Sequence, residues 1–346
     1  MKTFYTAGHT AHVPQEEFEA GRMTPAVEVP ARVETVRRRI AERKLGPIVE
    51  PTDYGLAPAL RVHNSEFVAF LQTAHARWAQ DHPGVDAIPS VFAPQITGQR
   101  RREVMARDST SARLGQYCFD TGTPITQGSW SAAAAAVNIA LSAAQAVRLG
   151  DAAAFALARP PGHHASTTQF GGYCYLNNIA IAAQFLTDTG ARCAIIDVDY
   201  HHGNGTQEIF YARDDVLFVS LHADPAFAYP VYWGFADEIG RARGEGFNLN
   251  LPLPIATNWQ GYREALAAAS ARIRSFSPDI LLVSLGLDTF ALDPICRFQL
   301  QSEDYLRLGA TLAELRKPTV FVFEGGYNLE HLAENTVNVL EGFAAA

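Results

Sequence analysis

The sequence has few cysteines and no excess of basic residues, and each shortage excludes a class of protein. None of its four cysteines stands in a CxxC pair, so we expect no zinc site built on paired thiolates. Lys and Arg number 28 against 36 Asp and Glu, which gives a net charge of -8 at pH 7. Because a nucleic-acid-binding surface needs a local excess of basic residues, we expect no nucleic-acid partner.

Long apolar runs are also missing. The first residues, MKTFYTAGHTAHVPQ, lack the apolar core of a secretory signal. The most apolar stretch, residues 131–150, is interrupted by Asn138, Gln145 and Arg148, so we expect no membrane span. These features predict a protein of a reducing, cytoplasmic compartment.

What the sequence does contain is a regular alternation of apolar strands and amphipathic helices after residue 129. We predict strands over 153–158, 192–197, 216–221, 280–285 and 319–323, and helices over 131–149, 176–187, 259–276, 302–315 and 329–343. Upstream we predict a strand over 2–5 and helices over 28–44 and 65–79, the latter capped by Ser65. This alternation predicts an α/β fold: one domain over 1–346 of three layers, α/β/α, with a mostly parallel central sheet.

Residues 81–124 break this rhythm. They are rich in Pro, Gly, Arg and Ser, and their periodicity is weak. A loop of this length in a compact domain is usually functional or disordered. We interpret the segment as an insertion near the entrance of the site, and a flexible surface insertion is the alternative.

The stretch AIIDVDYHHGNGTQ, residues 194–207, joins a buried strand to a cluster of polar groups. Carboxylates at the end of a buried strand are costly unless they are paired or metal-bound. Strand side chains alternate, so Asp197, Asp199 and His201 are predicted to share one face. The stretch predicts a divalent-metal site; a polar strand end capped by a helix is the alternative.

Other polar residues also follow predicted strands, where sites form in parallel sheets. We expect Asp288 to be the third metal ligand, because two carboxylates and one imidazole leave room for water and a substrate oxygen. His163 and His164 are candidates for general acid or base, and the Tyr327 hydroxyl for an oxyanion donor. The alternatives are loop histidines and a packing tyrosine.

The chain carries five motifs in order between Arg159 and Leu329: RPPGHHA, GGYCYLNN, DVDYHHGNGTQ, SLGLDTF and EGGYNL. Together they resemble the arginase/deacetylase fold and, within it, the zinc-dependent histone deacetylase superfamily. The segments VEVPARVETV and HADPAFAYP, with the 81–124 insertion, are more similar to its acetylpolyamine amidohydrolase branch than to protein deacetylases.

The resemblance implies roles for individual residues. Asp199, His201 and Asp288 match the ligands of one Zn²⁺ ion, and the same donors suit Fe²⁺. His164 matches the general base and His163 its electrostatic partner, with Asp197 behind the first histidine. Asn204 stands behind the second, and because it carries no charge we expect a less basic His164 than an aspartate would give. Tyr327 matches the transition-state tyrosine.

Further positions match the substrate tunnel. Tyr173 and Tyr229 match its aromatic walls, and Gly172 lines it. The family's acidic rim position is occupied here by Gly122, and the nearest acid is Asp120. Arg32 matches an arginine near the acetate exit.

The resemblance also implies structural K⁺ sites and a homodimer to which the insertion contributes. One K⁺ site matches Asp197, Asp199, His201, Ser220 and Leu221, and a second matches Phe210, Arg213, Val216 and Phe247.

The implied reaction is hydrolysis of N-acetylated polyamines or diamines, which are small-molecule substrates, to acetate and a free amine. A protein or acetyl-lysine deacetylase with the same chemistry is the alternative. A non-catalytic acyl or polyamine sensor is a third interpretation, although the metal ligands and Tyr327 are all present. An arginase-like hydrolase would need a second metal.

Overall fold

Eight parallel strands form the central sheet of the computed structural model, which describes residues 1–93 and 109–346. Every neighbouring pair is parallel, in the order β4-β1-β5-β10-β9-β6-β7-β8. The strands are β1 (Lys2–Phe4), β4 (Ile48–Val49), β5 (Ala153–Ala156), β6 (Cys193–Asp197), β7 (Val216–Ala223), β8 (Asn248–Leu253), β9 (Ile280–Leu285) and β10 (Thr319–Phe323). The predicted α/β fold with a mostly parallel sheet is confirmed.

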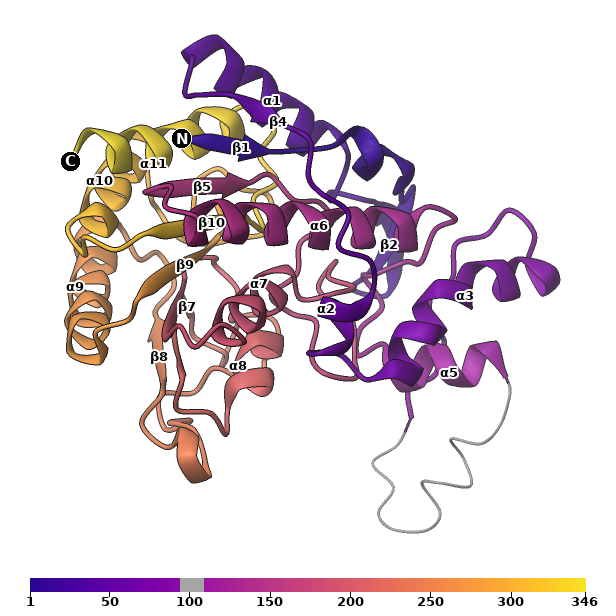
Figure 1. Cartoon of the computed structure of the whole chain (residues 1–346). Coiled ribbons are helices and arrows are strands. Elements are labelled where there is room, and N and C mark those ends of the chain that lie inside the picture. Colours follow the sequence, from indigo (N-terminus) through magenta and orange to yellow (C-terminus); the bar gives the residue numbers. More distant parts are fainter. Residues whose placement is uncertain (94–108) are drawn as a thin grey trace.

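Helices cover both faces of the sheet, so the strands are apolar on both sides (Figure 1). On one face lie α1 (Ala31–Arg43), α9 (Trp259–Phe276), α10 (Ser302–Ala313) and α11 (Leu332–Ala345). On the other lie α6 (Ser129–Arg148), α7 (Asn178–Thr187) and α8 (Asn204–Phe210). Helix α2 (Ala57–Leu60) packs on α7, and α3 (Ser65–Asp81) packs on α5 (Thr110–Tyr117) beyond the end of the sheet (Figure 1). Strand β10 shows the division, since Val320 and Val322 face the second group while Phe321 and Phe323 face the first.

Helix α6 is long and apolar enough to cross a membrane by length and composition alone. In this fold 67% of its apolar window is buried. Its alanines Ala136, Ala140 and Ala144 belong to the core on their face of the sheet. Packing inside the domain therefore accounts for its composition.

Several local predictions need correction. Helix α3 begins at Ser65, but its N-cap is Asn64, whose side chain accepts from the backbone N–H groups of Glu66 and Phe67. Ser65 is already helical, so the predicted cap is wrong. Sequence patterns also missed the antiparallel hairpin of β2 (Glu16–Glu19) and β3 (Arg22–Pro25).

Part of the predicted insertion is helical. Helix α5 lies inside residues 81–124, and the Ser109 side chain accepts from the backbone N–H of Ala112 at its start. Residues 94–108 of the insertion lie outside the described residues. Because all strands of the sheet are parallel, their carboxyl ends meet at one edge, and the polar motifs gather there.

Candidate active site

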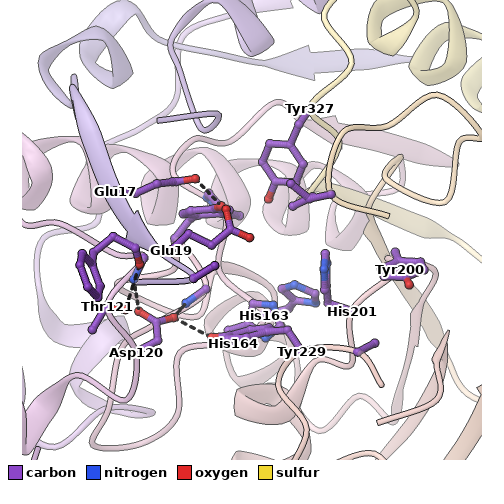
Figure 2. Close-up of a pocket in the computed structure, with 18 of the residues that line it drawn as sticks. Glu17, Glu19, Asp120, Thr121, His163, His164, Tyr200, His201, Tyr229 and Tyr327 are labelled. Atoms are coloured by element: carbon purple, nitrogen blue, oxygen red, sulfur yellow. Dashed lines mark hydrogen bonds between the residues drawn. The ribbon is translucent and has the colours of Figure 1, made fainter. Parts of the chain in front are cut away.

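A cavity of about 390 Å³ opens at the carboxyl edge of the sheet (Figure 2). Loops after β5, β6 and β10 contribute to its lining, together with the β2–β3 hairpin. Its lining includes His163, His164, Tyr173, His201, Tyr229 and Tyr327. With Asp120 and Gly172, eight residues singled out from the sequence therefore line one cavity.

The three predicted metal ligands converge from two neighbouring strands. Strand β6 ends at Asp197, so Asp199 and His201 lie in the turn after it rather than on the strand itself. Asp288 follows β9, which pairs directly with β6. One donor atom from each of the three residues lies within 4.8 Å of the other two, and all three residues are buried.

Charge and space at these donors suit a divalent cation. Burial and the neighbouring Asp199 raise the pKa of Asp288, while the two carboxylates outweigh burial and raise the pKa of His201 to about 9. The His201 Nδ1–H accordingly donates to Asp288 Oδ2 at 2.9 Å. A divalent cation bound here would displace that proton.

Gly325 preserves the space beside these oxygens. A Cβ at this position would lie 2.6 Å from Asp199 Oδ2 and 2.7 Å from Asp288 Oδ2. Two carboxylates and one imidazole are a donor set for Zn²⁺ or Fe²⁺. The residues therefore fit the metal that the sequence predicts.

A second group of donors, His163, Cys174 and Glu324, also lies close together among the described residues. His163 is already paired through Nδ1 with Asp197 at 2.9 Å. Burial raises the pKa of the Cys174 thiol well above its usual value, so the thiolate is disfavoured. We assign no metal to this group.

The pKa values of the tandem histidines are shifted in opposite directions. Burial lowers the pKa of His163, but Asp197 and Asp199 outweigh it and raise the pKa to about 10. Burial, then the charges of His163 and His201, lower the pKa of His164 well below its usual value. The His164 Nδ1–H donates to Asn204 Oδ1 at 2.7 Å, which leaves Nε2 free to accept a proton.

Tyr327 stands opposite the histidines across the cavity (Figure 2). Burial raises the pKa of its phenol well above 10, so the hydroxyl keeps its proton and can donate. Its backbone N–H donates to Asp293 Oδ2 at 2.7 Å. The Arg32 guanidinium lies 4.6 Å from the ring centroid. Sequence reasoning missed Asp293, which only a tertiary contact brings to this loop.

Aromatic rings form the walls. The Tyr229 ring stands edge-on to His164, with centroids 5.1 Å apart. Gly172 has φ +56°, and a Cβ there would lie 2.2 Å from His164 Cδ2. Asp120 accepts from the Gly172 N–H at 2.6 Å and from the Tyr229 hydroxyl at 2.7 Å. Asp120 thus lines the cavity, as predicted for a substrate-binding residue. Its carboxylate is hydrogen-bonded to Gly172 and Tyr229, so it also holds this wall in place.

Two acids that sequence reasoning missed also line the cavity. Glu17 and Glu19 come from strand β2 of the hairpin. Glu17 is 3% exposed and accepts from the Tyr173 hydroxyl at 3.2 Å. The available signal was the EEFE run before the Ala20–Gly21 turn, but the sequence does not show which surface the hairpin covers.

The structure places the remaining predicted residues without testing their roles. Asp197 pairs in register with Ser220, whose hydroxyl is hydrogen-bonded to His222 Nδ1 at 2.8 Å. The Phe210 carbonyl accepts from the Arg213 N–H at 2.9 Å, and the Phe247 carbonyl from the Phe218 N–H at 3.0 Å. The K⁺ sites and the homodimer stay predictions.

Comparison with known proteins gives matches over the whole chain. Residues 26–343 match the histone deacetylase domain. Acetylpolyamine amidohydrolase 1 of Pseudomonas aeruginosa is 47% identical over 100% of this chain and 99% of its own. The acetylpolyamine amidohydrolase of Mycoplana ramosa is 40% identical over 99% of this chain and 100% of its own. The crystal structure of acetylpolyamine aminohydrolase from Burkholderia pseudomallei superposes with a TM-score of 0.94 at 40% identity, covering 100% of this chain and 99% of that one.

Proposed function

The chain belongs to the histone deacetylase family of amidohydrolases, and we propose that it hydrolyses N-acetylated polyamines or diamines to acetate and a free amine. The observation that carries this proposal is a cavity lined by aromatic rings with carboxylates beside them. Tyr173 and Tyr229 suit a slender methylene chain, and their ring faces also attract a cation. Glu17 and Glu19 lie on the same cavity and offer negative charge to a distal ammonium group.

The chain's own side chains divide the chemistry between them. Neutral His164, oriented by Asn204, accepts the proton of the attacking water at Nε2 and returns it to the leaving amine. Charged His163 and the Tyr327 hydroxyl stabilise the negative charge that develops on the carbonyl oxygen. When held by Asp199, His201 and Asp288, a divalent metal supplies a Lewis acid for the carbonyl and lowers the pKa of water.

Kinetics on a substrate panel test this function. We expect acetylputrescine and acetylcadaverine to have higher kcat/KM than an acetyl-lysine peptide. The diamines carry a free ammonium group at the far end of the methylene chain, where Glu17 and Glu19 can attract it, and the peptide has none there. Dominance of the peptide would contradict the substrate class and favour a protein deacetylase. Tight binding of acetylated amines without hydrolysis would favour a sensor.

Glu17→Gln is expected to weaken binding of acetylated diamines. Burial raises the pKa of Glu17 to about 7, against the lowering effect of the Tyr173 hydrogen bond. The carboxylate is therefore fully ionised only above pH 7, and KM for diamines should fall as pH rises through 7. In the variant, KM should rise about 10-fold, as expected for loss of a charge-assisted contact, and lose that pH dependence.

N-acetylbutylamine, which has a similar chain but no ammonium, is the matched control substrate for Glu17→Gln. Its KM should be nearly unchanged by the substitution. An equal rise in KM for both substrates would show that Glu17 supports the wall through Tyr173 rather than binding a cation.

Asn204→Asp is expected to make His164 more basic. A carboxylate at Nδ1 favours the imidazolium, so the pKa of His164 should rise by about one unit. Since His164 must be neutral to accept a proton, the acid limb of the kcat/KM profile should move to higher pH. Profiles of the variant and the wild type, measured with the same diamine, check this shift; an unmoved limb would assign that limb to another group.

A further inference from the structure

A carboxylate outside the cavity, Glu28, lies between two buried arginines. Its Oε1 accepts from Arg32 Nη1 at 2.8 Å and from Arg159 Nε at 2.7 Å. All three side chains are 0–1% exposed. Glu28 precedes helix α1, while Arg159 opens the loop that carries the tandem histidines. One carboxylate thus joins two distant segments of the chain.

The other donors of the two arginines reach backbone carbonyls, and those of Arg32 lie beside the site. Arg32 donates through Nε to the Gly326 carbonyl at 2.6 Å and through Nη2 to the Glu324 carbonyl at 2.5 Å. These carbonyls flank the turn that leads to Tyr327. Arg159 donates to the carbonyls of His9 and His12, both at 2.9 Å.

Arg32 is also the support beneath the Tyr327 ring. Its guanidinium lies 4.6 Å from that centroid and 5.0 Å from the centroid of Phe323. All three nitrogens of the Arg32 guanidinium donate hydrogen bonds, which fixes the orientation of this planar group. Glu28 accepts one of these three bonds. Without the carboxylate, both buried guanidinium groups would lose the counter-charge that they contact directly.

We infer that Glu28 is a positioning residue for the reaction: through Arg32, it holds the Tyr327 loop and ring where the hydroxyl meets the developing oxyanion. The inference rests on the proposed function, in which Tyr327 donates only in the transition state. An interaction made only there changes kcat and leaves KM unchanged. A displacement of about 1 Å at a catalytic group can cost on the order of 100-fold in rate.

Glu28→Gln tests the inference, with Glu34→Gln as the matched control. Glu34 lies on helix α1 and contacts Tyr5, His9 and Arg37, but not Arg32. We expect Glu28→Gln to lower kcat about 10- to 100-fold with KM for acetylputrescine within about twofold, and Glu34→Gln to leave both near wild type. Glu28→Asp, which keeps the charge, should recover part of kcat.

A second substitution separates positioning from general support of the fold. In an Arg32→Met background the path to Tyr327 is already broken, so adding Glu28→Gln should lower kcat little further. Equal fold-losses with and without Arg32 would overturn the inference, because Glu28 would then act by another route.

A readout without substrate keeps the inference testable even if the proposed substrates fail. In protein labelled with 3-fluorotyrosine, the ¹⁹F resonance of Tyr327 is identified by its loss in Tyr327→Phe. We expect this resonance to shift in Glu28→Gln and to stay in place in Glu34→Gln. An unmoved resonance in folded Glu28→Gln would contradict the positioning role, whereas a wild-type protein inert on every acetylated amine would contradict the proposed function alone.

Discussion

Replacing Asp288 with alanine is expected to abolish both metal binding and turnover. Asp288 is buried beside Asp199 and His201, and its removal leaves two of the three donors that lie within 4.8 Å of one another. Loss of a residue that only supports a ligand typically weakens metal binding by about 10- to 100-fold, and loss of a direct ligand should cost more. Metal content after dialysis and kcat/KM on acetylputrescine measure the two effects.

Asp224→Ala is the matched control for Asp288→Ala. Asp224 also follows a strand of the sheet, β7, but its side chain accepts from the backbone N–H of Ala226 and does not line the cavity. This variant should keep metal and turnover. If Asp288→Ala retained a full equivalent of metal, Asp288 would not be a ligand.

Tyr327→Phe should keep the metal and lose turnover. The substitution removes one hydroxyl and leaves the ring over Arg32 in place. Removal of a single oxyanion donor costs about 100- to 1,000-fold in kcat, and KM should change little because the contact forms in the transition state. Steady-state kinetics with metal analysis on the same sample check both parts.

Tyr305→Phe controls for the loss of a buried tyrosine hydroxyl. Tyr305 is fully buried, and its hydroxyl is hydrogen-bonded to Thr289 at 3.0 Å and to the Leu287 carbonyl at 3.2 Å. We expect a lower melting temperature and near-normal kcat. Normal turnover in Tyr327→Phe would remove that residue from the mechanism.

The sheet and the convergence of Asp199, His201 and Asp288 could be predicted because strand ends are visible in the local sequence. An apolar run followed by a polar cluster marks a strand end, and parallel strands bring such ends to one edge. Asp199 and Asp288 are 89 positions apart in the sequence, yet β6 and β9 are neighbours. The strand boundaries themselves were less accurate, since β6 stops at Asp197 and a turn carries Asp199 and His201.

The residues that were missed depend on contacts distant in sequence. Glu17 reaches the cavity only because the β2–β3 hairpin folds over it and the Tyr173 hydroxyl meets its carboxylate. Glu28 contacts Arg32, and Asp293 accepts from the Tyr327 backbone. Although Glu28 lies in the segment VEVPARVETV, nothing in that segment shows which buried groups its carboxylate meets. Burial of a charged side chain is a tertiary property, so neither composition nor periodicity reports it.

The most direct test of the proposed site is a titration of metal against turnover in a single preparation. Protein stripped with a chelator and given back Zn²⁺ or Fe²⁺ should regain hydrolysis of acetylputrescine in proportion to metal bound, and reach full activity at one equivalent per chain. Metal-free protein that is fully active, or activity that requires two equivalents, would contradict a single catalytic ion held by Asp199, His201 and Asp288.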